Sequence, residues 1–433
     1  MHRPAPLLVL AAALLVSCAT ASFQRVDAAL GNGRFEDSAD ILEKDRGSLY
    51  KPRDAVLYYL DKGMLTHYAG LYDDSSRLLE AGERAIEAAF SKSILMEIST
   101  YLLNDTTQEY AGEDYEDIYI NSFNALNYYH QGDLEEAMVE IRRMNNKTRN
   151  LADKYGVLTT NLQQKAMADS LPIPPNANAP SRFNDSALAR YLGMLFYRGT
   201  GRPDDARIDW DYLRLSFANA PNLYPHPLPS SLGGELDISP GMARFNVVAF
   251  AGLSPVKKAN VIRIPLGNRY IKIALPEMVY RPSTVARIEV IFDDGQRCNL
   301  ELLEDIEAIA RDTYKAREQV IYLKTIIRAT AKGLSSAVLG SMAEETEGDR
   351  SLLYGILSLG TQIFAEASEQ ADLRISRYFP AKAYVGGITL NPGLYSFKVV
   401  YYNYSGRVIS SFRYEDIPVR ENRLNLTEAI CLK

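Results

Sequence analysis

Apolar residues in the first half of the chain recur at the three-to-four-residue spacing that is typical of amphipathic helices. Four similar turns interrupt this pattern. Each has a glycine, two consecutive acidic residues and then a small residue: Gly33-Arg-Phe-Glu-Asp-Ser38, Gly70-Leu-Tyr-Asp-Asp-Ser75, Gly132-Asp-Leu-Glu-Glu-Ala137 and Gly201-Arg-Pro-Asp-Asp-Ala206. Glycine ends a helix without a side-chain penalty, and acids are stabilised at the positive end of the next helix. The pattern therefore predicts four pairs of antiparallel helices.

A bulky residue follows the small residue of each turn after four positions. The pairs are Ser38 and Leu42, Ser75 and Leu79, Ala137 and Ile141, and Ala206 and Trp210. A small residue in the second helix lets the two helices of a pair approach closely. This arrangement resembles the tetratricopeptide repeat, which implies an N-terminal α-solenoid over residues 18–218. The spacing between the four turns is irregular, and an unrelated helical bundle with similar turns is the alternative.

The periodicity changes after residues 219–240. Four prolines between 219 and 234 exclude a regular helix, and we expect a Pro-rich linker there. In residues 241–433, short segments rich in β-branched and aromatic residues predict strands at 243–252, 261–264, 270–275, 285–292, 297–300, 382–389, 394–403 and 408–414. Longer apolar patterns at about 301–372 predict an inserted helical hairpin. The expected fold class is α+β: an α-solenoid of tetratricopeptide-like helix pairs, then a β-rich domain with this insertion.

The N-terminus has the pattern of an export signal. A basic residue precedes an apolar run that is too short to span a bilayer, and residues 1–17 are therefore predicted to be a signal peptide. The run ends in Leu-Val-Ser-Cys18, which resembles the lipobox of bacterial lipoproteins. This resemblance implies that Cys18 is acylated and becomes the first mature residue. The alternative is a secretory signal cleaved near Ala19 or Ala21.

Acyl chains on Cys18 would hold the mature protein on a membrane. Ala19, rather than an aspartate, follows the cysteine. By analogy with enteric lipoproteins, this points to the outer membrane of a bacterial cell envelope. The other two cysteines, Cys298 and Cys431, are either joined in a disulfide, as an exported protein allows, or isolated from each other.

Nearly the whole mature chain resembles a group of uncharacterised bacterial lipoproteins with tetratricopeptide-like repeats. The matching stretches include EDYEDIYINSFNALNYYHQGDLEEAMVEIRRMNNK, AGLSPVKKANVIRIPL, YKAREQVIYLKTIIRATAK, QADLRISRYFPAKAYV and LNPGLYSFKVVYYN. The resemblance implies an architecture, and it brings no catalytic residues with it.

The charge and the motifs of the chain limit which ligands and reactions are expected. The formal charge of -6 and the absence of a basic block argue against a nucleic-acid partner. Three histidines of the mature chain are widely scattered, and we expect no metal and no cofactor. Ser254-Pro-Val-Lys257 matches a serine-enzyme pattern but lies in a Gly/Pro loop, and no catalytic residue is assigned. The acidic run Glu113 to Asp117 lacks the spacing of a calcium loop, and we interpret it as a solvated helix start.

Stacked helix pairs form a concave surface lined by the first helix of each pair. In the register set by Ala137, this surface is an apolar and aromatic groove for a partner. The candidate residues are Leu60, Met64, His67, Tyr119, Ser122, Leu126, Tyr129, Tyr191, Leu195 and Arg198. The alternative is that these residues bury the helices against the chain's own C-terminal part. The sequence favours a non-enzymatic scaffold that is anchored to the membrane and binds an envelope protein. The runner-up is an enzyme or enzyme regulator acting on cell-wall material.

Overall fold

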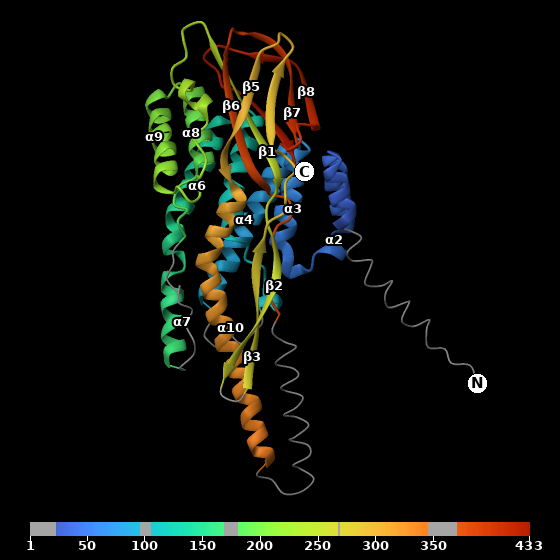
Figure 1. Ribbon diagram of the computed structural model, residues 1–433, viewed down its shortest axis with the longest axis vertical. Coiled ribbons are helices and arrows are strands. Elements are labelled where there is room, and N and C mark those ends of the chain that lie inside the picture. Colours follow the sequence, from blue (N-terminus) through green and yellow to red (C-terminus); the bar gives the residue numbers. More distant parts are fainter. Residues whose placement is uncertain (1–22, 96–104, 169–180, 267–268, 345–369) are drawn as a thin grey trace, which may run out of the picture.

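The computed structural model describes residues 23–95, 105–168, 181–266, 269–344 and 370–433. The predicted signal peptide and Cys18 lie outside these ranges. The described residues form an elongated α+β molecule, in which paired helices are followed by a mixed sheet with one long helix (Figure 1). The predicted fold class is therefore confirmed at this level.

The N-terminal region is a series of helix pairs. Residues 23–31 are helical and precede eight further helices. These are α2 (Phe35–Leu49), α3 (Ala55–Tyr68), α4 (Tyr72–Leu95), α5 (Asp114–His130), α6 (Leu134–Lys154), α7 (Gly156–Ala168), α8 (Ala187–Gly199) and α9 (Pro203–Asn219). Short 3-10 turns lie at Pro52–Asp54, Asp105–Thr107 and Ser230–Gly234.

The four predicted turns share one geometry. Their glycines have positive φ angles between 73° and 85°, a conformation that glycine adopts without strain. At each turn the amide of the residue after the glycine donates back into the last turn of the helix, as from Asp133 to the Tyr128 carbonyl at 2.8 Å. The small residues Ser38, Ser75, Ala137 and Ala206 are all completely buried. The helix pairs are therefore confirmed.

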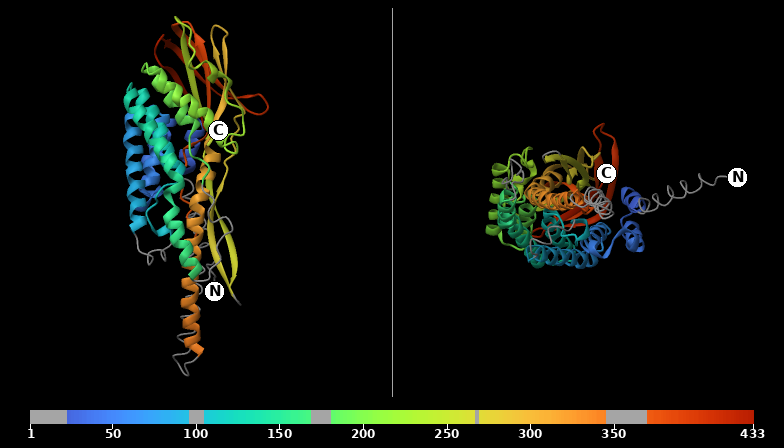
Figure 2. Two further views of the ribbon diagram at one scale, coloured as in Figure 1. Left: turned by 90° about the vertical axis from the view of Figure 1, so that its left-hand side faces the viewer. Right: turned by 90° about the horizontal axis from the view of Figure 1, so that it is seen from below.

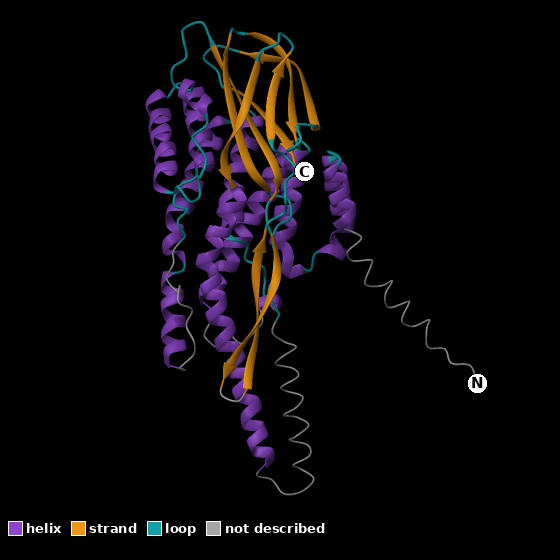
Figure 3. Cartoon of the chain, viewed as in Figure 1, coloured by secondary structure: helices purple, strands orange, loops and turns teal. Residues whose placement is uncertain are grey.

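Figure 3 shows most of the strands gathered at one end of the molecule. Seven strands of the C-terminal region form a sheet in the order β8-β7-β4-β5-β6-β1-β9. Its strands are β1 (Ala243–Leu253), β4 (Arg287–Phe292), β5 (Arg297–Asp305), β6 (Pro380–Leu390), β7 (Gly393–Tyr402), β8 (Val408–Val419) and β9 (Asn425–Cys431). All neighbours are antiparallel except β1 and β9. The two end strands approach each other, because the Tyr414 hydroxyl of β8 donates to the Glu428 carbonyl of β9 at 2.8 Å. The sheet is nearly closed.

The two faces of this sheet bury different cores. On β1, Val247 and Ala249 belong to a core enclosed by the curved sheet, whereas Val248 and Phe250 belong to the core of the helices. This alternation follows from the two-residue period of a strand. The helices and the outer face of the sheet therefore share one continuous core across the predicted 219–240 linker, where Leu232 and Glu235 are buried.

A two-stranded ribbon and a long helix project from the same end of the sheet. The ribbon consists of β2 (Val256–Leu266) and β3 (Arg269–Val279), and the helix is α10 (Ile306–Glu344). Figure 2 shows that both run alongside the helix pairs and extend beyond them. Within the described part of the chain, no helix combines the length and the apolarity needed to cross a bilayer.

All the predicted strands are present, and the structure differs from the prediction elsewhere in the C-terminal region. Residues 302–305 continue β5, and α10 begins at Ile306 rather than at Leu302. The last strand, β9, was not predicted. The second helix of the predicted hairpin, from 352 to 372, lies largely outside the described residues, and residues 370–379 form an extended segment.

Candidate functional site

The ten residues of the predicted groove are not open to a partner in this structure. All are buried except Tyr129 and Arg198, which are half-buried. Leu60, Met64, Leu126 and Leu195 belong to the core that the helices share with the sheet, and Ser122 packs on Met144 of α6. The remaining residues contact the C-terminal half of the chain. The sequence offered burial against the C-terminal half of the chain as the alternative to an open groove, and these residues are buried in that way.

Polar contacts join the helices to the sheet along the whole groove. The Tyr129 hydroxyl donates to the Leu426 carbonyl at 2.8 Å. Asn246 donates to the Tyr191 hydroxyl at 3.3 Å and accepts from Arg198 at 2.6 Å. Arg198 also pairs with Glu235, which is completely buried. The helical region therefore holds its own strands where we expected a partner.

Two histidines meet one carboxylate at one end of this interface. His67 of α3 lies with Nε2 2.8 Å from Glu428 Oε1, and His130 of α5 lies with Nε2 3.0 Å from Glu428 Oε2. The His67 Nδ1 atom lies 2.7 Å from Asn127 Oδ1. The ring of Tyr72 stacks on His130 at a centroid distance of 4.2 Å. These groups come from α3, α4, α5 and β9, and the tertiary structure brings β9 next to the three helices.

The geometry fixes the charge of His67. The Asn127 amide nitrogen donates to Ser75, which leaves Oδ1 as the acceptor that faces Nδ1. Both ring nitrogens of His67 therefore face oxygen acceptors, and the ring must carry both protons. Burial opposes this charge, but Glu428 and Asn127 outweigh it and raise the pKa of His67. Burial likewise opposes ionisation of Glu428, and the two histidines lower its pKa to about 2.

A hollow of about 400 Å³ lies beside this ion pair. His67, Tyr72 and His130 line it from the helices, and Tyr414 and Glu428 line it from the sheet. Glu428 contacts two histidines and is a poor general base, because its pKa lies far below neutrality. The contacts of this centre instead hold the helices to the last strand.

A second buried carboxylate, Glu304, lies on β5 at an irregularity in the β5–β6 register. It accepts hydrogen bonds from Tyr119 at 2.6 Å, Ser186 at 2.8 Å and Tyr224 at 2.8 Å. The amide of Leu188, in the first turn of α8, also donates to it. Burial raises the pKa of Glu304 despite these donors. The centre ties α5, α8 and the Pro-rich segment to the sheet.

The extended segment 372–379 lies against the helices like a bound peptide. Asp61 accepts from the Ser376 hydroxyl at 2.8 Å and from the Arg377 amide at 2.7 Å. Glu116 accepts from the Ser376 amide at 2.5 Å, and the Tyr68 hydroxyl donates to the Tyr378 carbonyl at 2.7 Å. Burial raises the pKa of Asp61 to about 6, and burial with nearby Glu113 raises that of Glu116 to about 7.

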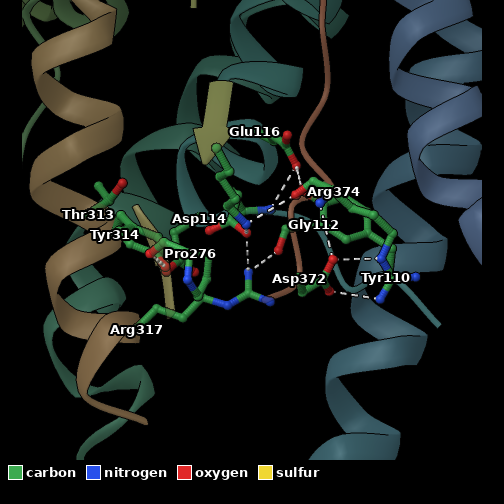
Figure 4. A network of polar contacts seen from close by, with 12 residues as sticks. Tyr110, Gly112, Asp114, Glu116, Pro276, Thr313, Tyr314, Arg317, Asp372 and Arg374 are labelled. Carbon is green, nitrogen blue, oxygen red and sulfur yellow. Dashed lines mark hydrogen bonds and ion pairs between the residues drawn. The ribbon is translucent and has the colours of Figure 1, made fainter. Parts of the chain in front are cut away.

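A polar pocket of about 120 Å³ lies where α10, the ribbon and the start of α5 meet (Figure 4). Glu113 Oε1 pairs with Lys257 and, at 3.2 Å, with Arg317. Arg317 also donates to the Gly112 carbonyl, and Asp114 accepts from Lys154 at 2.6 Å. Arg374 pairs with Asp372 on another wall of the pocket.

This pocket corrects our interpretation of the acidic run. Glu113, Asp114 and Glu116 are 2%, 3% and 0% exposed, whereas we expected a solvated helix start. Glu116 accepts from the Glu113 amide at 2.7 Å, as the third residue of a helix does in a capping box, and a glutamate at that position is the sequence signal for this. The burial of these carboxylates could not be predicted, because their cationic partners come from distant segments.

A shallower hollow of about 250 Å³ lies between α6, α8 and α9. Arg142 and Arg149 of α6 line it together with Ile208 of α9. Ile208 begins a row that continues with Tyr212 and Leu215, and these side chains are 49%, 44% and 49% exposed. The three residues belong to α9, which lies at the edge of the helix pairs (Figure 1).

The remaining sequence candidates lie apart from one another. Ser254 is buried and accepts from Tyr115, whereas Lys257 pairs with Glu113. Cys298 and Cys431 are both free thiols, which answers the question of a disulfide between them. Among the described residues, no group of histidine, cysteine and acidic side chains is placed to hold a metal ion.

The sequence did not identify Glu428, Glu304, Arg317 or the extended segment. Glu428 alternates with Leu426 and Ile430 on β9, and a lone carboxylate on an apolar strand face is a usable signal for a buried ion pair. Comparisons with protein-family models, with curated proteins and with solved structures find no match to this chain.

Proposed function

We propose that this protein is a membrane-anchored, non-enzymatic scaffold of the bacterial cell envelope. In this proposal, acylated Cys18 attaches it to the outer membrane, and the helix pairs are tetratricopeptide-like repeats that present a binding face. The lipobox-like sequence supports the anchor. The shared geometry of the four turns and the buried small residues support the repeat assignment.

The observation that carries the binding function is the exposed apolar row on α9. Ile208, Tyr212 and Leu215 follow the i, i+4, i+7 spacing of a helix face that packs on another helix. The face that we first expected to bind a partner is filled by the chain itself. We therefore assign the partner to the exposed row on α9.

The charges beside this row indicate the partner's chemistry. Arg142 is exposed and has no ion-pair partner among the residues that the structure describes. Arg149 bonds only to neutral groups, the Asn145 carbonyl and the Asn146 side chain. The acids of the hollow are already paired, Asp209 with Arg190 and Asp205 with Arg202. The partner is therefore an envelope protein that presents a helix with an apolar stripe and flanking carboxylates.

Site-specific photocrosslinking in intact cells tests this proposal. A photoreactive residue at Tyr212 is compared with one at Leu394, which is 70% exposed on β7 and serves as the control. We expect Tyr212 alone to give a defined adduct that maps to an acidic, apolar helix of an envelope protein. The substitution Ile208→Asp should abolish the adduct. Equal crosslinking at both positions, or an adduct that survives Ile208→Asp, would contradict the proposal.

Reversing the charge at Arg142 gives a second, independent test. In the Arg142→Glu variant, we expect the affinity for the crosslinked partner to fall by about tenfold at low salt, since a complementary charge becomes a repulsive one. The difference should shrink at high salt. Glu87→Lys, an exposed reversal on α4, is the control and should leave the affinity unchanged.

A further inference from the structure

The polar pocket beside Arg317 has hydrogen-bonding groups that the fold itself does not use. Among the described residues, Glu113 Oε2 is buried without a hydrogen-bond partner, and the whole residue is 2% exposed. An unsatisfied buried carboxylate oxygen carries a desolvation cost. This oxygen belongs to a residue that lines the pocket.

Arg317 supplies the complementary donors. Its Nη1 atom bonds to Glu113 and to the Gly112 carbonyl. Its Nε and Nη2 atoms have no hydrogen bond to any residue in the described ranges. Neither atom is among the buried atoms without a partner, so both keep solvent access, and Arg317 is one of the residues that line the pocket. Two neighbouring N–H groups of a guanidinium match the two oxygens of a carboxylate or phosphate.

The surrounding charges favour an anion at this position. Lys154, Lys257 and Arg317 bring three positive charges, and the carboxylates they contact, Glu113 and Asp114, bring two negative ones. Arg374 is matched separately by Asp372 and Asp54. The side chains of Lys257 and Glu113 are only 3% and 2% exposed, which strengthens their interactions with a charged ligand.

We propose that this pocket binds a small hydroxylated anion. Its carboxylate or phosphate group lies against Nε and Nη2 of Arg317. Its hydroxyl group donates to Glu113 Oε2, which is buried in the ligand-free structure and which a rotation of the carboxylate turns toward the pocket. A hydroxyl is favoured over an ammonium group, because Glu113 already contacts two cations. The pocket volume of about 120 Å³ holds several water molecules and therefore a ligand of similar size. This inference is independent of the partner proposed for α9.

Titration calorimetry of the full-length protein in detergent tests the inference. The probes are glycerol 3-phosphate and glycerate, which carry both groups, and inorganic phosphate and glycerol, which carry one each. We expect at least one of the first two probes to bind at least about tenfold more tightly than either single-group probe. If neither hydroxylated anion binds, or if inorganic phosphate binds as tightly, the inference is overturned.

Matched variants on α10 locate the site. Arg317→Lys keeps the charge but removes the paired donors, and we expect it to weaken binding by about tenfold or more. Arg311→Lys makes the same change at an exposed position of the same helix and should bind like the wild type. Equal affinities for the two variants would overturn the assignment to this pocket.

Two further variants test the role of Glu113 and provide an alternative to Arg317→Lys. Glu113→Gln should remove the preference for the hydroxylated anion over inorganic phosphate. Should Arg317→Lys fail to fold by circular dichroism, Ala111→Met fills the pocket without changing its charges. Folded Ala111→Met protein that binds the probe with wild-type affinity would overturn the inference.

Discussion

The imidazole of His67 lies 2.8 Å from the carboxylate of Glu428, although 361 positions separate the two residues in the sequence. Because the other ring nitrogen faces Asn127, His67 is held as a buried cation. His130 contacts the second oxygen of the same carboxylate. One carboxylate of the last strand thereby holds two helices of the repeat region.

This ion pair predicts how stability depends on pH. The pKa of Glu428 is lowered from 4.5, and its contribution is present above pH 4.5 and lost as the pH falls toward 2. The pKa of His67 is raised from 6.5, and its contribution is present below pH 6.5 and lost as the pH rises through the folded-state value. The pair therefore stabilises the chain most between pH 4.5 and 6.5.

Guanidinium unfolding at about pH 5.5 and about pH 8.5 checks this prediction. At the lower pH, we expect His67→Asn to reduce the free energy of unfolding by about 3 kcal/mol, since it leaves a buried carboxylate with one partner fewer. The alkaline loss of stability should be smaller in this variant. His226→Asn is the control: burial lowers the pKa of His226, so its contribution has the opposite pH dependence. An unchanged alkaline loss in His67→Asn would contradict the assignment.

The Glu304 centre predicts that a neutral amide cannot replace the carboxylate. Glu304→Gln brings two N–H donors to a position where four donors already converge, and we expect a loss of about 1–3 kcal/mol in the free energy of unfolding. Tyr119→Phe removes one donor and should cost about 1 kcal/mol. Chemical unfolding measures both. Glu415→Gln, at a side chain that is 71% exposed, should show no change, and equal effects at 304 and 415 would contradict the prediction.

The repeat turns predict a difference between two neighbouring glycines. Gly33 has a φ of 73°, whereas Gly31, in the helix before it, does not have a positive φ in the left-handed region. An added Cβ meets nothing within 4 Å at either position. Gly33→Ala should therefore cost about 1–2 kcal/mol through backbone strain alone. Gly31→Ala should be neutral or slightly stabilising. Thermal unfolding of the two variants gives the comparison, and equal melting temperatures would argue against the turn geometry.

The lipid anchor predicts a change in fractionation. Cys18→Ala should release the protein from membranes or block its processing, because no acyl chain can then be attached. Membrane fractionation and the mass of the mature N-terminus measure this. Cys298→Ala removes a cysteine elsewhere and should leave fractionation unchanged. Full membrane retention of the processed Cys18→Ala protein would show that the attachment is not through this residue.

The helix pairs and most strands could be predicted because their signals are local. Gly132 and Ala137 mark a turn within six consecutive residues, and the strands of the sheet show their short β-branched runs directly. The strand β9 was missed, since Thr427 and Glu428 interrupt its apolar residues and its parallel pairing with β1 leaves no hairpin signal.

The groove residues show where prediction from sequence ends. We predicted Leu60, Tyr119 and Tyr191 on one surface of the helix pairs, and in the structure all three are buried. An apolar helix face is buried equally well by another protein or by the chain's own sheet, because the hydrophobic effect does not distinguish the two. From the sequence, these residues could bind a partner or pack on the chain's own sheet. Their contacts with Glu304, Glu428 and Asn246 show that they pack on the sheet.

The sequence by itself determined the turns, the helix pairs and the positions of most strands along the chain, because these depend on backbone preferences and on periodicity over a few residues. Only the tertiary structure decided which surfaces are covered and which charges are buried. Glu428 meets His67, and Arg317 meets Glu113, across more than two hundred positions of chain. Such pairs depend on how the sheet folds back on the helices, which no local pattern encodes.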